Sequence, residues 1–134
     1  MRAVDTNILV RYVVNDDPKQ AAIVEKFWVE CETNQEAIFI PVLVLCELVW
    51  VLGRLYAQTK PQLIEVLEKL LAVGFFRFEQ EPAVRQSLEH YRHGRATFPD
   101  YVIGEIGRQA GCRDTVTFDR DLRGAPGFTG QAML

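Results

Sequence analysis

Short apolar segments alternate with longer helical ones along the whole chain, and this alternation restricts the possible folds more than any other feature of the sequence. The segments that indicate buried strands are residues 2–4, 37–40, 75–78 and 115–117, with a further short strand expected at 131–134. Short buried strands separated by helices are typical of a parallel sheet that is covered on both faces. We therefore predict a three-layer α/β/α fold with a central parallel sheet of four to five strands.

Proline, glycine and small polar residues mark the ends of the helices between these strands. We predict that Asn7 caps the first helix and that Asp16 and Asp17 serve as caps at the start of the second. The expected helices span residues 7–14, 18 to at least 31, 42–57, 61–73, 82–94 and 99–111.

The chain has 134 residues, of which 49% are apolar and 25% charged, so we predict one ordered domain over residues 1–134. The formal net charge of −3 argues against a protein that coats nucleic acid through bulk positive charge. It does not exclude an enzyme that acts on nucleic acid with the help of metal ions.

The sequence also predicts where the protein resides. The most apolar stretch, residues 37–55, is interrupted by Pro41, Glu47 and Arg54, so no membrane span is expected. The three cysteines, an odd number without paired spacing, indicate reduced thiols. With an acid at position 5, where a signal peptide would be apolar, the chain is expected to be cytoplasmic.

Two aspartates follow predicted strands directly or closely. Asp5 comes after the first strand and Asp119 lies two residues past the fourth. In open α/β sheets ligands bind beyond the carboxyl ends of the strands, so both residues are candidates for a functional site. The alternative is that Asp5 serves as a turn or cap residue, because aspartate bonds readily to nearby backbone amides.

Glu47 lies on a helix whose residues one turn away are all apolar, among them Leu43 and Trp50. A carboxylate in an apolar environment is costly unless it is paired or bound to a metal, which favours a functional role. The alternatives that remain open are an ion pair with Arg54 or another base, and a position on the helix flank from which the side chain reaches solvent.

Asp100 is expected in the first turn of a helix, where a favourable interaction with the helix dipole is a sufficient explanation when it is considered alone. Asp119 and Asp121 flank Arg120, and a turn or cap role is expected for at least one of them. His90 and His93 are three residues apart near a helix end, and we interpret them as a solvated helix end rather than as metal ligands.

Taken together, Asp5, Glu47, Asp100 and Asp119 come from four separate segments that a parallel sheet can bring to one edge. Four carboxylates in one cleft repel one another unless a cation neutralises them. Oxygen ligands of this kind suit Mg²⁺ or Mn²⁺, and such sites are well suited to phosphoryl transfer.

Four segments resemble the motifs of the PIN domain, in the order and at the spacings found in VapC toxins of bacterial and archaeal toxin–antitoxin pairs. These segments are Val4–Val10, Cys46–Leu48, Phe98–Ile103 and Val116–Leu122. The resemblance extends over the whole chain. It implies a Mg²⁺- or Mn²⁺-dependent endoribonuclease that cleaves RNA phosphodiesters by in-line attack of metal-activated water.

The resemblance also implies a role for individual residues. The metal ligands fall on Asp5, Glu47, Asp100 and Asp119. Thr6, Asn7 and Thr117 fall at positions of small polar residues that orient the acids or water, and Asp121 remains an alternative to Asp119. The chain departs from the family pattern at Thr97, where many relatives have a further acid.

The partners implied by the resemblance are an RNA substrate, a small antitoxin protein and a second copy of the chain. Apolar side chains expected on the surface for a homodimer are Phe27, Trp28, Leu63 and Leu67. Arginines near the motifs are interpreted as surface charge, with phosphate binding as the alternative: Arg11, Arg95, Arg120 and Arg123.

Four other functions would use similar residues. The same carboxylates would serve a metal-dependent phosphatase or a DNA nuclease, and a PIN-like module would bind RNA without cleaving it. A receiver-like signalling domain is disfavoured, because Asp5 has no adjacent acid and no lysine follows a late strand.

Overall fold

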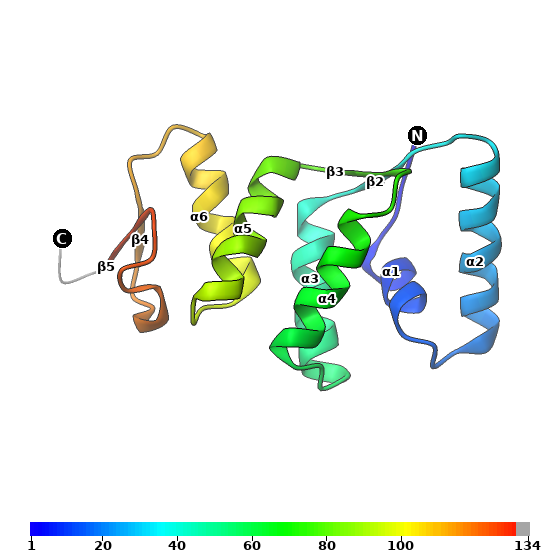
Figure 1. Cartoon of the computed structure of the whole chain (residues 1–134), viewed down its shortest axis with the longest axis horizontal. Coiled ribbons are helices and arrows are strands. Elements are labelled where there is room, and N and C mark those ends of the chain that lie inside the picture. The colour runs from blue at the N-terminus through cyan, green and yellow to red at the C-terminus, as the bar shows by residue number, and fades with distance from the viewer. Residues whose placement is uncertain (131–134) are drawn as a thin grey trace. The chain divides into compact units, whose positions relative to one another are not determined.

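The computed structural model describes residues 1–130 of the chain. These residues form two compact units, which we call unit 1 (Met1–Glu79) and unit 2 (from Gln80 onward). Figure 1 shows the elements of both.

Unit 1 contains a parallel sheet of three short strands in the order β1 (Arg2–Ala3), β2 (Ile38–Ile40), β3 (Phe76–Phe78). Ile38 of the central strand pairs with Arg2 on one side and with Phe76 on the other. Both isoleucines of β2 are fully buried, as expected for the central strand of a covered sheet.

The helices of unit 1 are α1 (Thr6–Val13), α2 (Pro18–Thr33), α3 (Val42–Leu55) and α4 (Lys60–Leu71). α1 packs against both α2 and α3, and α3 packs against α4 (Figure 1). The core combines buried leucines of α1 and α3 with an aromatic cluster in which the ring centroid of Trp28 lies 5.4 Å from that of Phe76.

Side chains expected on the surface for a dimer belong largely to this core. Trp28, Leu63 and Leu67 are only 6%, 8% and 1% exposed, and Phe27 is half-buried. That expectation is wrong for Trp28, Leu63 and Leu67, which are buried in the core of unit 1, whereas Phe27 keeps part of its surface exposed.

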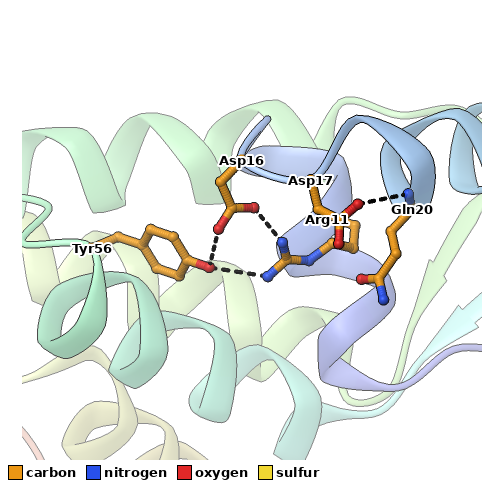
Figure 2. A network of polar contacts seen from close by, with 5 residues as sticks. All are labelled: Arg11, Asp16, Asp17, Gln20 and Tyr56. Atoms are coloured by element: carbon orange, nitrogen blue, oxygen red, sulfur yellow. Dashed lines mark hydrogen bonds and ion pairs between the residues drawn. The ribbon is translucent and has the colours of Figure 1, made fainter.

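A network of polar contacts connects the end of α1 and the loop after it to the end of α3 (Figure 2). Arg11 pairs with Asp16 and also donates a hydrogen bond to the Tyr56 hydroxyl at 3.0 Å, and that hydroxyl donates to Asp16 at 2.8 Å. The bond to Tyr56, followed by the charge of Asp16, raises the pKa of Arg11. Asp17 caps α2 as predicted, whereas Asp16 serves this network instead of a cap.

Unit 2 begins with two packed helices, α5 (Glu81–His93) and α6 (Phe98–Gln109). Fully buried Ala83, Val84 and Phe98 lie in its core. The chain then forms β4 (Thr115–Thr117), a 3₁₀ helix η1 (Arg120–Leu122) and β5 (Phe128–Gly130), and β4 pairs with β5 in parallel.

The predicted α/β fold with parallel strands is confirmed, and the described residues hold five strands, three in unit 1 and two in unit 2. The strand expected at 131–134 lies outside the described residues, and β5 comes directly before it. The predicted cap Asn7 is wrong, because Asp5 caps α1 and the helix begins at Thr6. Within residues 1–130, no helix has the length and apolar character needed to cross a membrane.

Candidate active site

Asp5 lies where β1 ends and α1 begins. Its backbone is extended, and its Oδ1 accepts a hydrogen bond from the Ile8 amide at 3.2 Å, so this carboxylate caps the helix. The side chain is exposed, and its Oδ2 has no partner among the described residues. Of the two helper candidates that follow, Thr6 is buried and Asn7 is exposed.

Glu47 is exposed on α3, between two apolar side chains that are also exposed, Leu43 (72%) and Trp50 (58%). Glu47 is therefore open to solvent in unit 1, and the expectation that it lies in an apolar environment is wrong. Glu47 makes no ion pair with Arg54 or with any other described residue. Both of its carboxylate oxygens are available for a ligand.

Glu79 is a further carboxylate of unit 1, which the sequence did not single out. It directly follows β3, and its Oε1 accepts a hydrogen bond from the Val42 amide at 3.0 Å. Since Pro41 provides no side-chain cap, Glu79 satisfies the first turn of the helix that carries Glu47. The signal that would have revealed it is the one used for Asp5, an acid directly after a predicted strand.

Asp100 lies in the first turn of α6 and forms a capping box with Thr97. Its Oδ2 accepts from the Thr97 amide at 2.9 Å and from the Thr97 hydroxyl at 2.7 Å, and its own amide contacts that hydroxyl oxygen at 3.4 Å. The helix-start role expected for Asp100 is therefore present, while Oδ1 has no partner among the described residues.

Asp119 follows β4 and caps η1. Its Oδ1 accepts from the Asp121 amide at 2.8 Å, and its own amide donates to the Thr117 hydroxyl at 3.0 Å. The predicted cap role thus belongs to Asp119 rather than to Asp121. Thr117 thus holds the backbone of Asp119 where β4 ends.

The four candidate ligands are divided equally between the units, with Asp5 and Glu47 in unit 1 and Asp100 and Asp119 in unit 2. Across residues 1–130, no three or more His, Cys, Asp or Glu side chains gather as possible ligands of one ion. In its chemistry, the donor set fits Mg²⁺ or Mn²⁺, because every candidate is a carboxylate with at least one oxygen not used by a cap.

His90 is not part of a solvated helix end. It is half-buried on α5, and its Nε2 lies 3.1 Å from Oε1 of Glu105 on α6. Glu105 is only 6% exposed, and its other oxygen pairs with Arg108 at 2.9 Å. His93 does match the expectation, since it is exposed and its one polar contact within residues 1–130 is with Glu89. Glu105 was not predicted, because its partner lies on another helix.

The arginines near the motifs differ in their surroundings. Arg11 is held by Asp16 and Tyr56, so its charge stabilises unit 1. Arg95, Arg120 and Arg123 are exposed, and none of them forms an ion pair with a described residue.

Comparison with known proteins adds to these observations. The family model of the PIN domain matches residues 2–127. The VapC ribonuclease of Aquifex aeolicus (strain VF5) is 28% identical over 123 residues, which are 92% of this chain and 90% of that protein. The crystal structure of Mycobacterium tuberculosis VapC20, described as a Sarcin-Ricin loop cleaving toxin, is 17% identical with a TM-score of 0.46, covering 95% of this chain and 96% of that one.

Proposed function

This chain belongs to the PIN domain family, and from this premise we propose that it is a metal-dependent endoribonuclease, the toxin of a type II toxin–antitoxin pair. The observation that carries the proposal is that all four motif acids are present within the matched residues. The similarity to a VapC ribonuclease over nearly the full length of both chains supports RNA as the substrate.

We assign the roles of metal ligands to Asp5, Glu47, Asp100 and Asp119. Mg²⁺ or Mn²⁺ bound by these carboxylates would activate water and stabilise the charge that develops on the phosphodiester. Thr117 fixes the backbone that carries Asp119, and Thr97 fixes the Asp100 carboxylate. The resemblance implies products with 5′-phosphate and 3′-hydroxyl ends.

The test compares two aspartates that have the same structural task. Asp5 caps α1 and Asp17 caps α2, each through a carboxylate oxygen that accepts a backbone amide. Asparagine keeps such a cap but removes the charge. We expect Asp5→Asn to lower the rate of RNA cleavage at least about 100-fold, because a ligand charge is lost, whereas Asp17→Asn keeps the parental rate.

Cleavage is measured on single-stranded RNA with Mg²⁺ or Mn²⁺, and again after EDTA is added, with mapping of the product ends. Equal rates for Asp5→Asn and the parent protein would rule out the assigned mechanism. RNA binding without cleavage would identify a binding module. Parallel assays on DNA and on a phosphomonoester distinguish a DNA nuclease and a phosphatase from a ribonuclease.

The proposed protein partner is the cognate antitoxin, and its expression together with the chain is expected to relieve growth arrest. Induction of the parent chain without that partner should arrest growth, whereas induction of Asp5→Asn should not. The RNA ends that accumulate only with the parent chain would then define the target.

A further inference from the structure

Unit 2 contains a pocket of about 380 Å³ beside the turn between α5 and α6, and the proposed metal ligands do not account for it. Residues that line it include Arg95, Arg123, His90, Tyr101 and Asp121. The volume lies within the range of roughly 300–1,000 Å³ that is typical of small-molecule sites. The pocket is large enough to admit part of a nucleotide.

The charge balance of this pocket favours an anion. Glu89 also lines it, but Arg92 and His93 already contact the Glu89 carboxylate at 3.4 and 3.0 Å. The carboxylate of Asp121 then remains as one negative charge, and the guanidinium groups of Arg95 and Arg123 supply two positive charges. Neither arginine has an ion-pair partner within residues 1–130.

The backbone that carries Arg95 is held in place by Tyr101. The hydroxyl of this buried tyrosine accepts a hydrogen bond from the Ala96 amide at 3.2 Å. At Gly94, an added Cβ atom would lie only 1.8 Å from the same hydroxyl oxygen, so glycine is needed for this close approach. Arg95 thus extends from a turn that is fixed on both sides.

Arg123 is anchored in a comparable way. Its amide donates to the Arg120 carbonyl at 3.2 Å, and the preceding Leu122 is only 4% exposed. The cap by Asp119 fixes the other end of the same short helix. Because both arginine backbones are fixed, less conformational entropy is lost when their side chains bind a ligand.

We propose that this pocket binds a phosphodiester group of single-stranded RNA, with Arg95 and Arg123 donating hydrogen bonds to its non-bridging oxygens. The guanidinium group matches the geometry of phosphate oxygens and donates in pairs. Tyr101 directly follows Asp100, and Asp121 lies two residues after Asp119, so RNA held here lies against the two segments of unit 2 that carry candidate ligands. This inference rests on the proposed function.

The test measures binding separately from cleavage. The affinity of a short, fluorescein-labelled single-stranded RNA of mixed sequence is determined by fluorescence anisotropy in EDTA, over a range of salt concentrations. The proteins are the parent chain, Arg95→Gln, Arg123→Gln and the two matching lysine variants. Arg113→Gln is the control, because this arginine is also exposed in unit 2 but does not line the pocket.

We expect each glutamine variant to weaken RNA binding about tenfold, since a charge-assisted hydrogen bond is lost. The slope of log K against log salt should fall by about 0.7 for each lost phosphate contact with a single strand. The lysine variants, which keep the charge but not the paired donors, should fall between these variants and the parent. Arg113→Gln should bind like the parent.

Two outcomes would overturn the inference: glutamine variants that bind RNA as Arg113→Gln does, or a parent chain that does not bind this RNA. In the first case, a pocket for an acidic peptide becomes the better interpretation. Thermal unfolding of each variant verifies that it is folded. If the parent cleaves RNA with Mg²⁺ while the arginine variants bind normally, this inference fails and the proposed function stands. Arginine-dependent binding of RNA without any cleavage would support this inference and contradict the proposed ribonuclease activity.

Discussion

At the scale of single residues, three of the four candidate ligands also stabilise the start of a helix. Asp5, Asp100 and Asp119 each accept a backbone amide, and each keeps one carboxylate oxygen without a partner among the described residues. The cap role and the ligand role, which the sequence presents as alternatives, are therefore compatible. Alanine at these positions would combine two losses, so asparagine is the more informative substitution.

The environment of Glu47 shows where residue-level prediction reaches its limit. Apolar residues occur on every side of α3, so the local pattern does not reveal which face of the helix is buried. Leu45, Leu48 and Leu52 turn into the core, while Glu47 remains exposed with Leu43 and Trp50. Long-range packing decides this choice, and the spacing of residues along one helix does not contain it.

The cysteines permit a prediction from burial. Burial raises the pKa of the Cys46 thiol to about 11 and also raises that of Cys31, whereas Cys112 is exposed. A raised pKa leaves less thiolate, and for Cys46 at pH 8 the reactive fraction is about one in a thousand. We expect iodoacetamide to modify Cys112 first, with the labelling rate of Cys46 increasing as the pH approaches 11.

Mass spectrometry of the labelled peptides checks this order of reactivity. Cys112→Ser serves as the control, because it should remove the fast phase and leave the slow phases unchanged. Labelling of Cys46 at the rate of Cys112 at pH 8 would contradict the prediction.

At the scale of elements, capping boxes begin two helices, and only one of these helices carries a candidate ligand. Thr59 caps α4, and Thr97 caps α6 while also holding the Asp100 carboxylate. We expect Thr59→Ala and Thr97→Ala each to lower the free energy of unfolding by about 1 kcal/mol, because a cap is lost. If the proposed function holds, Thr97→Ala should also reduce RNA cleavage.

Urea denaturation measures the stability of both variants, and the cleavage assay distinguishes them. Thr59→Ala is the matched control, since it removes the same kind of cap from a helix without a site residue. Parental cleavage rates in Thr97→Ala would show that the contact between Thr97 and Asp100 serves only the fold.

Elements that begin with local signals were predictable. The prolines at 18, 61, 82 and 99 placed the starts of α2, α4, α5 and α6 to within one residue. The start of α1 was not predictable, because Asp5 and Asn7 are both good caps. The end of β1 decides which of the two has the extended backbone. β5 was also missed, since its sequence, Phe-Thr-Gly, contains a single apolar residue.

At the scale of the whole molecule, we expect the protein to form a homodimer, as its resemblance to VapC toxins implies. Three of the four apolar side chains expected at this interface are buried, but α3 exposes others: Leu43, Trp50 and Leu55 are 72%, 58% and 68% exposed. Light scattering at micromolar concentration should give twice the chain mass of 15.3 kDa, and a mass of one chain would contradict this.

The overlap between capping and candidate ligation has a genetic consequence. Every aspartate codon becomes an asparagine codon through a single transition, and asparagine is as good a helix cap as aspartate. If the proposed function holds, one base change at Asp5 or at Asp119 suffices to silence the toxin while the cap and the fold are kept.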